Sequence, residues 1–150
     1  MRSLDRPSSK PWTRPKALSD LLPLAIGLLA LAGMGVASVL TWLYYQPTSP
    51  FCTGVGGCHV VATSPYAHLG PVPVALMGVL GYGAMALLAL SRQPWAMAAL
   101  LALSLGALIY SCYLTYLEVA VIHALCPWCL ASQGLVATLA ALSALRFLKS

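Results

Sequence analysis

Residues 126–148 read CPWCLASQGLVATLAALSALRFL, a cysteine pair followed by a long apolar run. The run from 130 to 148 has about the 20 residues that an α-helix needs to cross a hydrocarbon core. Cys126 and Cys129 are three positions apart, which places both side chains on one face of a helix. Pro127 suits a first helical turn, where the positive end of the helix dipole favours a thiolate. The stretch therefore predicts a redox dithiol at the end of a membrane helix.

The composition of the chain is that of an integral membrane protein. Of its 150 residues, 60% are hydrophobic and 7% are charged, whereas soluble proteins carry about 25% charged residues. Apolar runs predict an all-α bundle of four transmembrane helices, at about residues 21–45, 72–90, 95–117 and 130–148. The polar, basic and proline-containing residues 1–17 predict a disordered cytoplasmic tail, followed by one membrane domain over residues 18–150.

The basic residues predict the orientation of these spans. All eight Lys and Arg residues lie in the N-terminal tail, between the second and third spans, or at the end of the fourth. With four spans these segments share one side of the membrane, and the positive-inside rule makes that side cytoplasmic. Both termini are then cytoplasmic, and the connections 46–71 and 118–129 face outward. Because the basic residues flank apolar runs and form no patch, we expect no nucleic-acid partner.

A second cysteine pair lies in the first outer connection, which we expect to be a structured loop. Cys52 and Cys58 enclose a glycine-rich ring, CTGVGGC, that can close as a disulfide and still move. Both pairs then face the oxidising compartment. A mobile pair opposite a fixed pair predicts a relay by thiol–disulfide exchange. Of the other residues, Cys112 is expected to be a small buried apolar side chain, and Glu118 to lie at the membrane interface.

Two other interpretations of the four outer cysteines stay open at this point. They could form two structural disulfides in a non-catalytic membrane protein, which would keep all four oxidised and bind no quinone. Cysteine pairs can also bind zinc, but their spacing and the oxidising compartment disfavour a metal site, and we expect none.

The whole pattern resembles the vitamin K epoxide reductase family. The resemblance rests on four spans, a Cys-x5-Cys pair in the first outer connection, CPWC at the start of the fourth span, and the stretches CHVVATSPYA (58–67) and GPVP (70–73). It runs from the first span to Leu148. It implies a bacterial inner-membrane enzyme that oxidises thiols, reduces menaquinone or ubiquinone, and supports disulfide formation in exported proteins. A DsbB-type enzyme is the nearest alternative, but its two cysteine pairs come in the opposite order.

The resemblance also implies a role for each outer cysteine. Cys129 faces the quinone and reduces it, Cys126 exchanges electrons with Cys58, and Cys52 reacts with a thioredoxin-fold protein. Many bacterial members carry a fused thioredoxin-like domain. Because this chain stops after the fourth span, the expected partner is a separate, DsbA-like protein.

Further residues are expected around the quinone. Ser64 matches a loop serine or threonine of the family, with an ordinary loop hydroxyl or a helix cap as the alternative. Tyr66 is expected to cover the pocket and Trp128 to line it, with loop packing and the aromatic belt as alternatives. Val74 and Gln133 stand where mammalian members have an asparagine and a tyrosine. Both differences favour a bacterial-type quinone reductase over an enzyme that accepts vitamin K epoxide.

Overall fold

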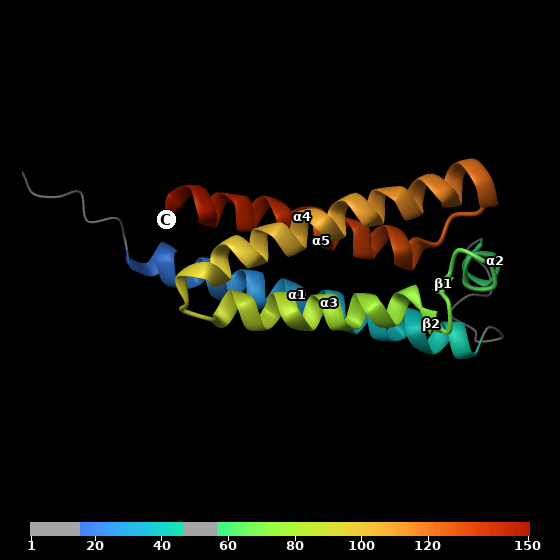
Figure 1. Ribbon diagram of the computed structural model, residues 1–150, viewed down its shortest axis with the longest axis horizontal. Helices are drawn as coiled ribbons and strands as arrows, with labels where there is room; N and C mark the ends of the chain where they lie inside the picture. Colours follow the sequence, from blue (N-terminus) through green and yellow to red (C-terminus); the bar gives the residue numbers. More distant parts are fainter. Residues whose placement is uncertain (1–15, 47–56) are drawn as a thin grey trace, which may run out of the picture.

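The computed structural model describes residues 16–46 and 57–150, and these are mostly helical. Within them, four long helices run along the longest axis of the molecule (Figure 1): α1 (Lys16–Tyr45), α3 (Val74–Leu90), α4 (Pro94–Leu117) and α5 (Pro127–Lys149). The predicted disordered tail lies outside the described residues, except for residues 16 and 17, which begin α1.

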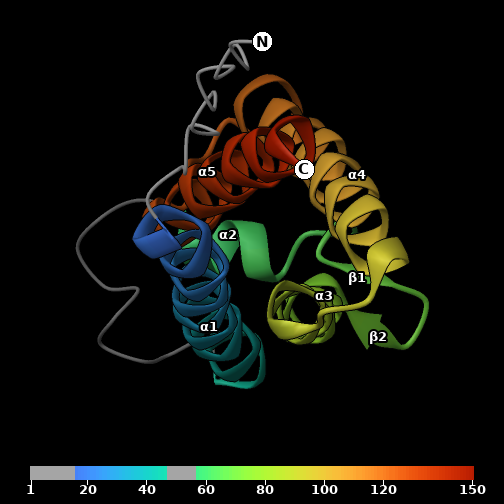
Figure 2. The ribbon, with the colours of Figure 1, turned by 90° about the vertical axis from the view of Figure 1, so that its left-hand side faces the viewer.

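The four helices form two layers around a shared interior. Helix α1 packs against α3 and α5, and α4 packs against α5 and α3, so the helices follow one another around the bundle (Figure 2). Small residues allow close approach in the α1–α3 layer. A Cβ atom on Gly33 would lie 2.3 Å from Cε1 of Tyr82. The core consists of buried apolar side chains: Ile26, Ala30, Ala37, Tyr82, Met85, Ala86, Ala89, Leu100, Val136 and Leu139.

Three of these helices are long and apolar enough to cross a membrane: α1 from Asp20, α4 with its extension to Ile122, and α5. They agree with three of the predicted spans to within a few residues. Helix α3 is equally apolar but has 17 residues, or about 25 Å at 1.5 Å per residue. Since a hydrocarbon core is about 30 Å thick, the second span stays a prediction.

The described part of the connection between α1 and α3 is folded. It holds the short helix α2 (Cys58–Ala62) and an antiparallel pair of strands, β1 (His68–Leu69) and β2 (Val72–Pro73). Gly70 turns the chain between the strands with φ of 63°, a conformation that suits glycine. These elements lie at the end of the bundle where α4 leads into α5 (Figure 1).

The corner between α4 and α5 is shaped by an irregular helix end. Helix α4 continues as a π-helix, η1 (Glu118–Ile122), which His123 ends in the left-handed conformation with φ of 55°. π-Helical turns carry an extra residue and are frequent at functional sites. Helix α5 then begins at Pro127, with Cys126 as its N-cap. The cysteine pair therefore lies at the start of α5. This helix begins three residues before the predicted span, which started at about residue 130.

Candidate redox site

Cys58 and Cys126 meet at the folded end of the bundle. Their sulfur atoms are 3.5 Å apart, although the residues are 68 positions apart in the chain. Both are buried, with exposed fractions of 4% and 2%. A disulfide bond is about 2.05 Å long, so this is a non-bonded contact from which only a small movement is needed to form a bond.

The absence of a side chain at Gly57 allows this approach. A Cβ atom there would lie 2.3 Å from Cβ of Ala124 and 3.0 Å from its Cα. The backbone at the start of α2 is therefore in contact with the chain just before Cys126. The carbonyl of Gly57 also accepts the N–H of Val61 at 2.8 Å, which ties Gly57 to the first turn of α2.

Cys126 and Cys129 differ in acidity. Hydrogen bonding from the Cys129 side chain lowers the pKa of Cys126 to about 6, and this outweighs burial and the charge of Glu118, both of which raise it. The N-terminus of a helix also favours a thiolate. At neutral pH, Cys126 is therefore mainly a thiolate.

Glu118 lies next to this cysteine pair. It is buried, with an exposed fraction of 3%, and its Oε2 accepts the backbone N–H of Cys126 at 3.3 Å. Its side chain also shares a hydrogen bond with that of Cys129. Its carboxyl is therefore turned into the bundle at the end of α4, and its expected depth at the membrane interface stays a prediction. One signal was available in the sequence, since no other acidic residue follows Asp20.

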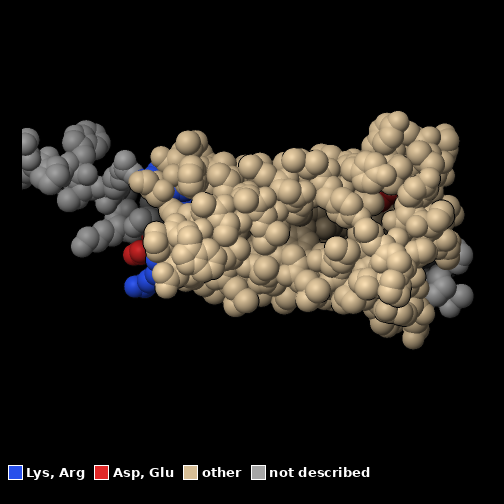
Figure 3. Space-filling view, in the orientation of Figure 1, with Lys and Arg blue, Asp and Glu red and all other residues tan. Residues whose placement is uncertain are grey.

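An apolar cavity of about 440 Å³ extends from the cysteines into the bundle. Pockets of this size hold ring-sized organic ligands. A hollow is visible on the face drawn in Figure 3. Residues from all four long helices and from α2 line the cavity, and its wall includes six of the predicted site residues: Cys58, Ser64, Tyr66, Val74, Cys126 and Cys129.

Three of these residues come from the connection between α1 and α3 and from the first residue of α3. The Ser64 hydroxyl is buried and donates to the carbonyl of Val61 at 2.8 Å. Tyr66 is 43% exposed and stands at the rim. Val74 begins α3, and its N–H donates to the carbonyl of Ala67 at 2.9 Å. The loop is thereby fastened over one end of the cavity.

Two of the remaining predicted residues, Trp128 and Gln133, are not in the wall. Trp128 is half-buried, about 100° around the helix from Cys129. Gln133 faces α4, where its Oε1 accepts the hydroxyl of Thr115 and its Nε2 lies 3.6 Å from the sulfur of Cys112. Thr115 does line the cavity. Cys112 is exposed on α4, so its predicted burial was wrong.

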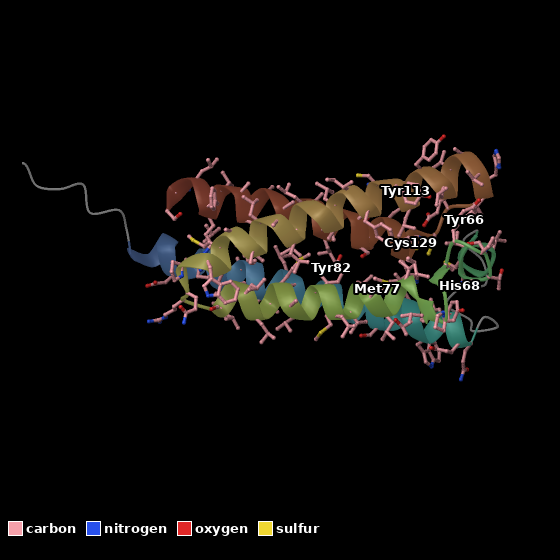
Figure 4. The ribbon with its side chains drawn as sticks, viewed as in Figure 1. Tyr66, His68, Met77, Tyr82, Tyr113 and Cys129 are labelled. Atoms are coloured by element: carbon pink, nitrogen blue, oxygen red, sulfur yellow. The ribbon has the colours of Figure 1, made fainter. Side chains whose placement is uncertain are left out.

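Sequence reasoning missed Tyr82, which lies between the two layers with Cys129 (Figure 4). Its hydroxyl is 2.9 Å from both the carbonyl and the hydroxyl oxygen of Ser132, one turn after Cys129 on α5. Both Tyr82 and Ser132 line the cavity. A tyrosine in the middle of an apolar run was the signal that could have found it.

Two further predictions concern a metal site and the position of Cys52. Among the residues that the structure describes, no three His, Cys, Asp or Glu side chains are grouped to hold a metal ion. Cys52 and its ring to Cys58 lie outside the described ranges.

The model of one protein family, described as the Vitamin K epoxide reductase family, matches residues 24–144. The match begins in α1 and ends in α5. It includes both cysteine pairs and all described residues between the two pairs. It covers most of the chain and confirms the resemblance drawn from the sequence. The chain therefore belongs to the vitamin K epoxide reductase family of membrane oxidoreductases.

Proposed function

We propose that this protein is a thiol–quinone oxidoreductase of the bacterial inner membrane. It oxidises the dithiol of a separate thioredoxin-fold protein and reduces a membrane quinone, menaquinone or ubiquinone, and so supports disulfide formation in exported proteins. The observation that carries the proposal is the 3.5 Å contact between the sulfurs of Cys58 and Cys126, next to a Cys129 that lines an apolar cavity.

Electrons enter through the outer loop. The partner's dithiol reduces the Cys52–Cys58 disulfide and is itself oxidised. The Cys58 thiolate then attacks Cys126 in a Cys126–Cys129 disulfide, which forms a Cys58–Cys126 bond and releases Cys129 as a thiolate. Attack of Cys52 on Cys58 re-forms the outer disulfide and leaves Cys126 and Cys129 reduced. A low pKa makes Cys126 a good leaving group in this last step.

Electrons leave through the cavity. Cys129 passes an electron pair to the quinone ring as Cys126 closes the disulfide, and the quinone becomes a hydroquinone. The largely apolar wall suits a lipid-soluble ring, and Ser64, Tyr66 and Val74 line it beside the cysteines. In this proposal Gln133 acts only indirectly, through Thr115, and Trp128 packs outside the ring site.

The same contact weighs against the structural alternative. Two independent structural disulfides, 52–58 and 126–129, give no reason for the sulfurs of different pairs to touch. A relay needs that contact, because thiol–disulfide exchange passes through a bond between the two pairs.

The proposed orientation places the cysteines outside the cytoplasm. The start of α1, the α3–α4 turn and the end of α5 share the end of the bundle opposite α2 (Figure 1). The blue Lys and Arg side chains visible in Figure 3 gather at that end. The positive-inside rule assigns it to the cytoplasm, with α3 as the second span.

The test is quinone reduction by the purified protein in detergent, with a reduced thioredoxin-fold protein as the donor and absorbance as the readout. We expect turnover in the wild type, no turnover in Cys129→Ala, and wild-type turnover in Cys112→Ala, a control on the exposed face of α4. If the wild type reduces no quinone with any dithiol donor while its outer cysteines stay oxidised, the structural alternative is correct.

A further inference from the structure

We propose that Glu118 is a catalytic residue that carries one proton from the Cys129 thiol to the quinone. The inference rests on the proposed function. Conversion of two thiols to a disulfide releases two protons, and conversion of a quinone to a hydroquinone takes up two. In a cavity with mostly apolar walls, proton transfer needs a group placed at the reacting atoms.

Glu118 is in the position that this step requires. Its carboxyl shares a hydrogen bond with the Cys129 side chain and is part of the cavity wall. One oxygen, Oε2, is held by the backbone N–H of Cys126 at 3.3 Å. That bond holds the carboxyl beside the cysteine pair in the wall of the cavity, which Cys129 also lines.

Other titratable residues belong to the elements that meet at Glu118. Helix α5 brings Cys126 and Cys129, and α2 brings Cys58 and carries His59 next in sequence. On its own side, His123 is exposed and its Nδ1 faces the carbonyl of Val121 at 3.2 Å.

Further titratable and basic groups lie elsewhere in the bundle. Tyr110 lines the cavity two turns earlier on α4. The basic residues within the described ranges belong to the segments at the opposite end of the bundle: Lys16 to the start of α1, Arg92 to the α3–α4 turn, and Arg146 and Lys149 to the end of α5. Within the described residues, Glu118 is therefore the only carboxyl at the cysteines.

Atoms and electrons balance in the proposed transfer from the two cysteines to the quinone. Cys126 starts as a thiolate, having lost its proton to solvent, and Cys129 starts as a thiol. Glu118 takes the Cys129 proton while an electron pair passes from the sulfurs to the quinone and the Cys126–Cys129 bond forms. Glu118 then gives that proton to one quinone oxygen, and the other oxygen takes a proton from water. The products are a disulfide, a hydroquinone and an ionised Glu118.

The test compares Glu118→Gln with Asp20→Asn, an acid-to-amide control at an exposed position of α1. The glutamine can still accept the Cys126 N–H, but it cannot take up a proton. General acid–base groups contribute about 10²- to 10⁴-fold, so kcat for quinone reduction should fall at least about 10²-fold, with the quinone KM unchanged. Asp20→Asn should behave as the wild type.

Two further readouts separate a proton carrier from a structural residue. In the wild type, kcat should rise with pH as Glu118 ionises. This rising part of the pH profile should be missing in Glu118→Gln. Reduction of Cys126–Cys129 without quinone, counted as alkylated thiols, should be unchanged. Glu118→Asp keeps a carboxyl, so it should recover part of kcat, and the rise of kcat should occur at a different pH. This variant carries the test if the glutamine variant does not fold.

Wild-type kcat and pH profile in Glu118→Gln, or in Glu118→Asp where that variant carries the test, would overturn the inference and leave the proposed function intact. Failure of the wild type to reduce any quinone would remove both. The two failures are therefore distinguishable.

Discussion

At the scale of single residues, the chemistry of the site depends on a difference between two thiols in one helical turn. Cys126 accepts hydrogen bonding from Cys129, and this is the largest cause of its low pKa. The thiolate is the form that exchanges with disulfides. Its neighbour keeps the proton that must leave when the quinone is reduced.

This difference predicts the pH dependence of Cys126. Because its pKa is lowered, Cys126 stays a thiolate at lower pH than an ordinary cysteine does. The ultraviolet thiolate absorbance of the reduced protein should therefore include one component with a midpoint near pH 6. An ordinary cysteine titrates near 8.5. The component should be missing in Cys126→Ser.

The cause of the shift can be tested with two replacements of Cys129. Cys129→Ala removes the donor and should move the Cys126 midpoint upward, whereas Cys129→Ser keeps an O–H donor and should hold it closer to 6. If the wild-type protein shows no component below about pH 8, the assigned acidity is wrong.

At the scale of elements, the relay depends on how closely α2 approaches the corner before α5. The contact between the backbone at Gly57 and Ala124 brings Cys58 to Cys126. Neither element could make this contact alone, because one belongs to the connection between α1 and α3 and the other to the corner between α4 and α5.

Gly57→Ala should therefore slow electron transfer between the pairs. The added Cβ would lie 2.3 Å from that of Ala124, and a displacement of about 1 Å at reacting atoms costs up to about 10²-fold in rate. Turnover with the thioredoxin-fold donor is the measurement.

Two variants control this prediction. Gly134→Ala, where an added Cβ meets nothing within 4 Å, should be silent. Ala124→Gly in the Gly57→Ala background should restore part of the rate, because the closest clash is between the two Cβ atoms. Full activity in Gly57→Ala would show that the close approach is not needed.

The elements also show what could be predicted from the sequence. Long apolar runs and the prolines at the starts of α4 and α5 indicated where the helices lie. The rotation of α4 about its axis was not predictable, because a helix that is apolar all round does not reveal its inner face. For that reason the burial of Glu118 was not predicted, and the predicted burial of Cys112 was wrong.

The candidate site was predictable to a similar extent. Cysteine spacing pointed to Cys58, Cys126 and Cys129, since such pairs carry a specific chemistry. Gln133 was expected at the quinone by position alone, but its amide has nearer partners on α4. Tyr82 was missed because its role depends on a hydrogen bond between helices that are far apart in the sequence.

At the scale of the whole molecule, the protein separates its functions along the bundle. The cavity adjoins the apolar core, with which it shares Tyr82 and Met85, and it reaches the cysteines at one end of the bundle. The Lys and Arg side chains visible in Figure 3 lie at the opposite end from the cysteines. In the proposed function, this arrangement places the thiols on one side of a membrane while the cavity stays within reach of a lipid-soluble acceptor.

The central claim is that electrons cross between the two cysteine pairs through Cys58 and Cys126. The most direct test is the variant Cys52→Ala/Cys129→Ala, which keeps these two cysteines and removes both groups that could resolve a bond between them. After mild oxidation, peptide mapping should find Cys58 linked to Cys126 in most molecules, with Cys112 still open to alkylation. A folded variant in which Cys58 and Cys126 both stay alkylatable would contradict the relay.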